Sequence, residues 1–252
     1  MRNARIGSNK RATIAKKVHI RCSACRHRDT SIFCDLAGTH LNTIDEQRDV
    51  HTFDRGQTIF YEGNPAFAIY CVFSGLVKLF KTSKRGERRI IRLLGPGEIM
   101  GYRALVANEQ YAATAEAVEA TTVCIISKDT ILLLLREAPA VALRLLAKMA
   151  HELRTSEEQM LDVAYTSVRQ RIAQTLLFLM RKTRAGGKDV ASLEVPLLRK
   201  EIADMIGTTP ETLSRTLRQF SQAGILKVTR SNICVQKLSR LQSLASESIG
   251  PT

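Results

Sequence analysis

The residues that decide the fold are 198–220, LRKEIADMIGTTPETLSRTLRQF. They contain two helical stretches separated by Gly207, and glycine is the residue type that most readily ends a helix in the left-handed conformation. Either Thr208 or Thr209 can cap the second helix, and Pro210 suits the first helical position after the cap. The pattern therefore predicts two short helices joined by a tight turn.

Both predicted helices have an apolar side and a polar side. Five apolar residues give them a shared packing surface, namely Ile202, Met205, Ile206, Leu213 and Leu217. Residues 225–228 and 233–237 flank Ser231 and Asn232 and are typical of a small β-hairpin. Helix, turn, helix and hairpin in this order predict a winged helix-turn-helix.

The polar side of the second helix has the chemistry of a DNA-reading surface. Arginine can donate two hydrogen bonds to guanine, glutamate can accept one from cytosine, and serine can contact a base edge or the thymine methyl group. We therefore predict that the DNA-binding residues are Thr209, Glu211, Thr212, Ser214, Arg215 and Arg218. The alternative is that Glu211 and Arg215, four residues apart, form only a surface ion pair.

Charge is distributed unevenly along the 252 residues. The chain has 38 basic and 24 acidic residues, and this formal charge of +14 favours an anionic partner. Residues 1–28 have nine basic residues and no acid, residues 166–252 have fourteen and six, and residues 29–165 have fifteen and eighteen. The apolar stretch 131–135 is too short to span a membrane, so we expect a cytoplasmic protein. An organelle-targeting segment is the alternative for the basic N-terminus.

Residues 50–127 consist of short β-prone runs separated by glycines. The runs at 68–74, 76–82 and 89–94 are rich in branched and aromatic residues, and residues 83–88 form a charged loop between two of them. Short strands that are evenly spaced by turns are typical of a barrel or jelly roll. We therefore predict an antiparallel β-domain here.

A long helical region follows the β-domain. Residues 129–137 predict one helix, Pro139 suits the start of another, and no Gly or Pro then occurs before Gly186. Within this region a heptad pattern predicts a dimer interface of Leu146, Met149, Leu153, Ser156 and Met160. Glu157 and Glu158 beside this seam would weaken the dimer and make it switchable. The alternative is a helix that packs only within its own protomer, since about three heptads are short for a coiled coil.

Six cysteines in a chain without an export signal favour metal binding or redox chemistry over a disulfide framework. Cys22, Cys25 and Cys34 lie on one basic segment, and an iron–sulfur cluster needs about four thiolates. Zinc binding, a thiol switch and the absence of any cofactor are the alternatives that this spacing leaves open. Cys71 and Cys234 have no partner at a useful spacing, and we predict that both are structural.

The sequence Glu-Thr-Leu-Ser-Arg at residues 211–215, after a β-domain and a heptad helix, resembles the Crp-Fnr family of bacterial transcription regulators. The resemblance runs from Cys22 onward and implies an α+β fold: a cyclic-nucleotide-binding-type β-roll (a double-stranded β-helix), a long dimerisation helix and a C-terminal winged helix-turn-helix. Glu211, Ser214 and Arg215 are similar to the Fnr branch, which implies an inverted-repeat DNA site like TTGAT-N4-ATCAA. It also implies contact with RNA polymerase, for which residues 83–88 are a candidate.

The Fnr branch takes a fourth cysteine from the last strand of its β-roll, in a context like residues 122–126 here. The resemblance therefore implies that Cys22, Cys25, Cys34 and Cys124 hold an oxygen-labile [4Fe-4S] cluster. The eight residues between Cys25 and Cys34 make a longer gap than in the best-known Fnr pattern. Basic residues near the cysteines would offset the negative charge of such a cluster; they are Arg21, Arg26 and Arg28.

A cyclic-nucleotide site needs a cation for the phosphate, a hydroxyl group beside it and a carboxylate for the ribose. When the chain is aligned with the family on Gly101, the carboxylate position is Tyr102, and the cation and hydroxyl positions are Ala112 and Ala113. We therefore expect no cyclic nucleotide to bind. Another small effector in the same pocket is the alternative.

The sequence thus predicts four parts: a cysteine-bearing arm (1–40), a β-roll sensor domain (41–137), a dimerisation helix (138–165) and a DNA-binding domain (166–252). We expect a homodimeric transcription regulator in which the cluster favours the dimer that binds DNA. No Cys, His and carboxylate form a recognisable catalytic arrangement, so we do not expect an enzyme. The alternative function is an effector- or thiol-gated Crp-type regulator without a cluster.

Overall fold

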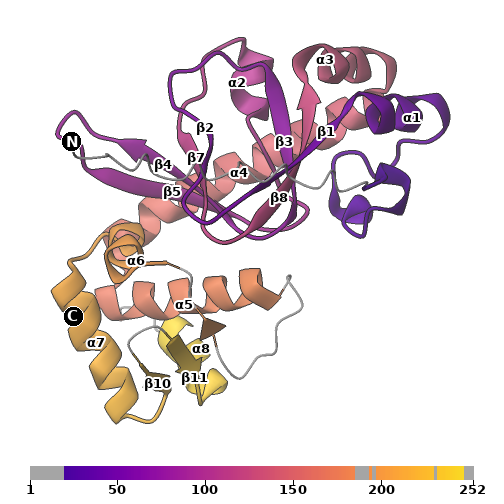
Figure 1. Cartoon of the computed structure of the whole chain (residues 1–252). Helices are drawn as coiled ribbons and strands as arrows, with labels where there is room; N and C mark the ends of the chain where they lie inside the picture. Colours follow the sequence, from indigo (N-terminus) through magenta and orange to yellow (C-terminus); the bar gives the residue numbers. More distant parts are fainter. Residues whose placement is uncertain (1–19, 185–192, 195–196, 230–231, 247–252) are drawn as a thin grey trace, which may run out of the picture.

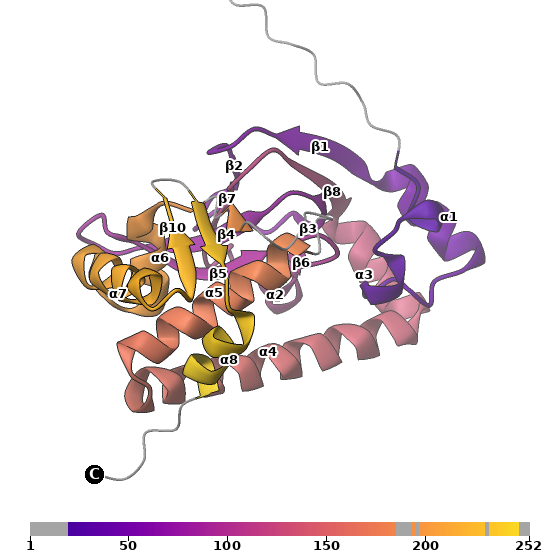
Figure 2. The same cartoon turned by 90° about the horizontal axis from the view of Figure 1, so that it is seen from below.

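The computed structural model describes residues 20–184, 193–194, 197–229 and 232–246 (Figures 1 and 2). The first part of the predicted basic arm, residues 1–19, lies outside the described residues, as do Gly186 and Ser231. No helix in the described part of the chain is long and apolar enough to cross a membrane.

The β-roll consists of two four-stranded antiparallel sheets. The first sheet has the strand order β1 (Asp49–Phe53), β8 (Thr121–Ser127), β3 (Ala68–Ser74) and β6 (Ile99–Met100). The second has the order β2 (Thr58–Phe60), β7 (Thr114–Ala117), β4 (Val77–Thr82) and β5 (Arg88–Leu94). In the first sheet, β3 and β8 pair so that Cys71 lies directly opposite Cys124. The β-domain predicted from the short apolar runs is confirmed.

The segment before the roll contains two short 3-10 turns, η1 (Cys22–Ala24) and η2 (Arg28–Thr30), and then helix α1 (Gly38–Gln47). A further short helix, α2 (Tyr102–Ala107), lies between β6 and β7. Neither α1 nor α2 was expected from the sequence pattern. In Figure 1 the segment with α1 packs beside the end of the roll that also carries α3.

Three helices lead from the roll to the C-terminal domain: α3 (Lys128–Glu137), α4 (Pro139–Tyr165) and α5 (Val168–Arg184). The side chain of Ser127 caps α3 by accepting a hydrogen bond from the backbone of Thr130 at 3.2 Å. The predicted long helical region is interrupted between α4 and α5, where the Ser167 hydroxyl accepts a hydrogen bond from the Gln170 backbone at 3.1 Å. Figure 2 shows α4 as a long rod along one side of the roll.

The C-terminal domain contains the predicted winged helix-turn-helix. Its helices are α6 (Arg199–Ile206), α7 (Pro210–Gln222) and α8 (Leu238–Ser246). Its wing is a three-stranded sheet in the order β10 (Leu226–Val228), β11 (Asn232–Val235) and β9 (Leu193–Glu194). The sequence predicted the hairpin of this sheet but not its third strand.

Two apolar cores hold the described residues together. One fills the roll and includes α1, α3 and the start of α4. The other fills the C-terminal domain and also contains five roll residues: Leu76, Phe80, Ile90, Leu93 and Val118. An ion-pair cluster also connects the roll with the C-terminal domain. Lys78 Nζ of β4 is 2.7 Å from Glu116 of β7 and 2.5 Å from Glu201 of α6. The C-terminal domain is therefore packed onto the second sheet of the roll.

Candidate DNA interface and cysteine site

Local capping positions helix α7. Gly207 ends α6 in the left-handed conformation with φ of +71°, which is the geometry that favours glycine. The Thr209 side chain then accepts a hydrogen bond from the backbone of Thr212 at 3.2 Å, and Pro210 follows in the first turn. Thr209, rather than Thr208, is therefore the cap of the second helix.

The packing of α7 leaves its polar side open. Leu213, Leu217 and Phe220 are all buried in the C-terminal core. Among the predicted DNA-binding residues Thr212 is half-buried, and the exposed ones are Thr209, Glu211, Ser214, Arg215 and Arg218. Hydrogen bonds from the helix backbone and from Thr209 lower the pKa of the Glu211 carboxyl, so this residue is a charged acceptor at neutral pH. Within the described domain Glu211 and Arg215 are not paired with each other, so both are available to a ligand.

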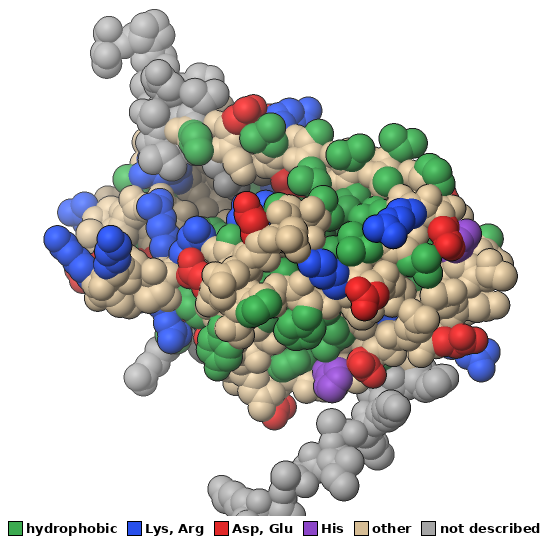
Figure 3. All heavy atoms as spheres, turned by 90° about the horizontal axis from the view of Figure 1, so that it is seen from above, with side chains coloured by type: hydrophobic (Ala, Val, Ile, Leu, Met, Phe, Trp, Pro, Cys, Tyr) green, Lys and Arg blue, Asp and Glu red, His purple; other side chains and the backbone are tan. Residues whose placement is uncertain are grey.

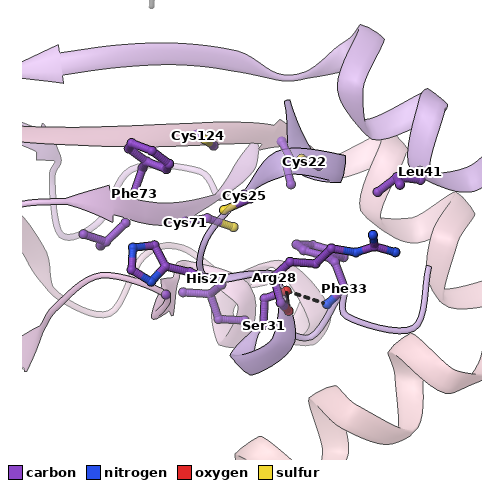
Figure 4. A pocket seen from close by; sticks show the side chains of 14 residues that line it. Cys22, Cys25, His27, Arg28, Ser31, Phe33, Leu41, Cys71, Phe73 and Cys124 are labelled. Carbon is purple, nitrogen blue, oxygen red and sulfur yellow. Dashed lines mark hydrogen bonds between the residues drawn. The ribbon is translucent and has the colours of Figure 1, made fainter. Parts of the chain in front are cut away.

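Four cysteines line one apolar cavity of about 50 Å³ between the N-terminal segment and the first sheet (Figure 4). Cys22 and Cys25 come from the segment around η1, Cys71 comes from β3, and Cys124 comes from β8. The side chains of Cys25 and Cys71 lie in the centre of the view in Figure 4. The structure thus brings together three of the four cysteines predicted to bind a cluster and adds a fourth that was predicted to be structural.

Burial controls the protonation of three of these thiols, Cys22, Cys71 and Cys124. It raises the pKa of Cys22 to about 12, although the Arg48 guanidinium partly opposes the shift. Burial also raises the pKa values of Cys71 and Cys124 above the ordinary range of a thiol. Without a cation in the cavity these cysteines are therefore neutral thiols, and a metal that bound them as thiolates would release their protons.

Two arginines beside the cavity have unused hydrogen-bonding capacity. Arg28 lines the cavity and donates to the carbonyl of Leu36 at 2.5 Å, whereas Arg48 is 2.9 Å from Asp45 and interacts with Cys124. In the described structure the Nε atoms of both arginines are buried and have no hydrogen-bond partner. Buried donors without acceptors are costly, and their positive charge suits an anionic group among the thiols.

These observations bear on the cluster that the sequence resemblance implies. Among the described residues, no three His, Cys, Asp or Glu side chains are placed as ligands of a single metal ion. In a four-iron cluster, however, each thiolate binds a different iron, so the thiols surround a larger group. Four thiols, an apolar lining and two arginines with buried Nε atoms fit an anionic iron–sulfur cluster better than they fit one zinc ion.

Cys34 lies apart from the cavity. Its neighbours Ile32, Phe33 and Leu36 are buried in the roll core, and Phe33 itself lines the cavity. The Cys34 thiol is hydrogen-bonded to Asp35, and Asp35 pairs with Arg144 of α4 at 2.5 Å. The predicted role of Cys34 as a ligand is therefore not matched by its position beside the other thiols.

The position of a cyclic-nucleotide carboxylate is occupied by a buried tyrosine. Tyr102 follows Gly101, whose φ is +85°, and its hydroxyl donates a hydrogen bond to Glu152 of α4. Arg92 and Lys148 also pair with Glu152, at 2.6 and 3.2 Å. The residue at the carboxylate position is thus engaged with α4, and the absence of cyclic-nucleotide binding stays a prediction.

Helix α4 has one side on the roll and one side open. Val141, Leu145 and Met149 pack on the roll core. Met149 therefore contacts its own protomer, although it also belongs to the predicted dimer seam. The other apolar seam residues are strongly exposed: Leu146 (61%), Leu153 (63%) and Met160 (74%). Ser156 is also exposed, and in Figure 3 hydrophobic side chains lie along the edge of the molecule where α4 runs.

A β-roll that is joined by a long helix to a winged helix-turn-helix with an open polar face defines a two-domain DNA-binding regulator. Two family models match the chain: the cyclic nucleotide-binding domain at residues 50–138 and the Crp-like helix-turn-helix domain at residues 170–244. The Cyclic AMP receptor protein of Thermus thermophilus is 32% identical over 196 residues, which cover 77% of this chain and 86% of the relative. The chain therefore belongs to the Crp/Fnr family of transcription regulators, which are not enzymes.

Other relatives include a transcriptional activator and an anaerobic regulatory protein. The Transcriptional activator protein anr of Pseudomonas aeruginosa is 26% identical and covers 89% of this chain and 92% of its own. The Anaerobic regulatory protein of Pasteurella multocida is 27% identical, and the match covers 81% of this chain and 73% of the relative. The solved structure of FixK2 from Bradyrhizobium japonicum has a TM-score of 0.71 and 28% identity, and covers 80% of this chain and 98% of that chain.

Sequence reasoning missed Cys71 as a member of the cysteine site. It is 37 positions after Cys34, and no local spacing relates it to the other cysteines. The relevant signal is the pairing of β3 with β8, which sets Cys71 opposite Cys124. A predicted strand register, rather than a cysteine motif, would have been needed to find it.

Proposed function

We propose that this regulator binds an inverted-repeat DNA site of the TTGAT-N4-ATCAA type as a homodimer, in response to low oxygen. The open side of α7 supports the DNA-binding role, with Glu211, Ser214 and Arg215 as base-contacting residues and Thr209, Thr212 and Arg218 beside them. The exposed apolar side of α4 supports the dimer. DNA binding would place the protein in the cytoplasm, and RNA polymerase would meet it through the exposed loop 83–88.

The observation that carries the oxygen response is the convergence of thiols from two separate parts of the chain on one apolar cavity. We propose that Cys22, Cys25 and Cys124 bind a [4Fe-4S] cluster together with a fourth thiol, which the resemblance to the Fnr branch assigns to Cys34. When bound, such a cluster would supply the sensitivity to oxygen. Arg28 and Arg48 would offset its negative charge.

The chain offers a direct route from the cysteine segment to the dimer helix. Asp35, next to Cys34, pairs with Arg144 of α4, and His40 of α1 contacts Glu137 of α3 at 3.3 Å. These pairs are exposed, so each contributes little by itself; they connect the N-terminal segment with α3 and with the start of α4. When the thiols lose their ligand, the segment would lose one attachment to the sheet, and this change would reach α4 through the pair between Asp35 and Arg144. The dimer-competent state then becomes less populated.

Anaerobic purification, followed by absorbance spectroscopy and assay of iron and sulfide, tests the proposal. We expect a coloured protein that contains both elements, and DNA affinity that falls on exposure to air. Cys234→Ser is the matched control, because Cys234 lies in the wing, away from the cavity, and its variant should behave like the wild type. A colourless, zinc-containing protein with the same DNA affinity in air and under nitrogen would disprove the oxygen response and leave the DNA-binding role intact.

A further inference from the structure

We propose that Cys71, and not Cys34, is the fourth thiol of the cysteine site. This inference rests on the proposed function, because it concerns the same site, but it departs from the ligand set that the family pattern implies. It follows from where the strands and the N-terminal segment place each of the five cysteines.

The pairing of β3 with β8 brings Cys71 to the site. Cys71 and Cys124 are direct partners in this antiparallel pair, and side chains that are directly opposite each other lie on the same face of the sheet with Cβ atoms about 4.5–5.5 Å apart. Both residues line the cavity, which shows that this face is the one toward Cys22 and Cys25. The two strands therefore supply half of a four-thiol site in fixed register.

The packing around Cys34 turns its thiol away from the same site. Ile32 and Phe33 on one side and Leu36 on the other are buried, at 6%, 6% and 4% exposure, so the segment is anchored at both ends. Phe33 enters the cavity wall, and Cys34, the next residue, is directed to Asp35 and Arg144. To bring Cys34 inward, the segment would have to withdraw Phe33 from the cavity and break the pair between Asp35 and Arg144.

The unusual spacing of the chain agrees with this assignment. The gap of eight residues between Cys25 and Cys34 includes the turn η2, after which the chain is already directed toward α1 and α4. A cysteine in β3 removes the need for a third ligand from the N-terminal segment. The site would then have two ligands on the N-terminal segment and two on the sheet.

The test compares Cys71→Ser, Cys71→Ala, Cys34→Ser and the control Cys234→Ser in the full-length protein. Each is reconstituted under nitrogen with ferrous iron and sulfide, and bound iron, sulfide and visible absorbance are measured. We expect both Cys71 variants to lose most of the bound iron and sulfide, and the Cys34 and Cys234 variants to retain them. Retention by the Cys71 variants together with loss by Cys34→Ser would overturn the inference.

Two further measurements guard against misfolding and separate this inference from the proposed function. Thermal melting of the unloaded variants reports on folding, and alanine at position 71 keeps a small apolar side chain in the strand. In the loaded wild type, Cys34 should still react with iodoacetamide, as seen by mass spectrometry; protection of Cys34 would contradict the inference without the use of any variant.

Excess cadmium without sulfide is the second probe, because several cadmium ions can share the thiolates and need no preformed site for a single ion. The ultraviolet absorbance of cadmium–thiolate bonds should correspond to four bound thiolates in the wild type and in Cys34→Ser, and to three in the Cys71 variants. If the wild type takes up no iron–sulfur cluster but gives this cadmium result, the oxygen response fails and the assignment of Cys71 stands. If neither iron with sulfide nor cadmium binds, both proposals fail.

Discussion

Replacement of Leu153 by alanine on the open side of α4 should weaken the dimer by about two orders of magnitude. Leu153 is 63% exposed in the protomer, and Leu→Ala removes three carbon atoms worth about 0.8 kcal/mol each when they are buried. Burial of the exposed fraction in the dimer therefore contributes about 1.5 kcal/mol per copy. Since a symmetric dimer has two copies, the loss is about 3 kcal/mol, and each 1.4 kcal/mol is a factor of ten in the dissociation constant.

Sedimentation equilibrium under nitrogen measures this dissociation constant. Leu198→Ala is the matched control, because Leu198 is equally exposed at 63% but lies at the start of α6, away from α4. We expect the Leu153 variant to dissociate at about hundred-fold higher concentration and the Leu198 variant to resemble the wild type. Equal dissociation constants for Leu153→Ala and the wild type would refute the assignment of this side of α4 to the dimer.

Three further predictions concern other parts of the chain. Arg215→Ala should reduce affinity for the cognate inverted repeat by about 1–3 kcal/mol in fluorescence anisotropy and change binding to random DNA little, and an equal loss on both would contradict base reading. Gly75→Ala should lower the free energy of unfolding in urea by about 3 kcal/mol, because φ is +90° and the new Cβ would be 2.4 Å from Thr121 Oγ1; a loss below about 1 kcal/mol would show that the turn can relax. Burial raises the pKa of Glu152, but hydrogen bonds from Arg92 and Tyr102 outweigh it and leave the pKa below its usual range. The stability that Glu152 contributes is thus present above the ordinary carboxyl pKa near 4.5 and is lost as the pH falls through the lowered value, so Glu152→Gln should flatten the acid limb of a stability–pH curve.

The DNA-binding domain was the part most fully predicted from the sequence. Gly207, Thr209 and Pro210 act through local backbone geometry, so three neighbouring residues are enough to place the turn and the start of α7. The polar side of α7 follows from helical periodicity in the same way. The choice between Thr208 and Thr209 as the cap, the third strand β9 and helix α8 needed the structure.

The helices α1 and α2 show the limit of local signals. Apart from the buried Leu41 and Ile44, α1 has a weakly apolar composition, and it has no side-chain cap. Helix α2 has six residues and is fixed by Gly101 before it and Asn108 after it, both in the left-handed conformation. Both helices are stabilised by packing on the roll, and a sequence pattern does not contain that contribution.

The cysteine site shows a different limit. Three of its four cysteines could be found from the family pattern, but Cys71 depends on the register between two strands that are more than 45 residues apart in the chain. A non-local contact also holds the segment of Cys34, because its neighbour Asp35 pairs with Arg144 of α4. The spacing of cysteines in the sequence identifies potential ligands, whereas only the fold determines which of them face one another.

The apolar core that contains both α5 to α8 and five residues of the roll affects how regulators of this type can be recombined. A chimera that joins this C-terminal domain to the roll of another family member would need compatible side chains at Leu76, Phe80 and Ile90, as well as a partner for Glu201. Conversely, residues 166–252 made alone would expose the apolar surface that now covers the second sheet. Engineers who combine the sensor domain of one such protein with the DNA-binding domain of another would therefore do best to move strands β4 and β5 together with the DNA-binding domain.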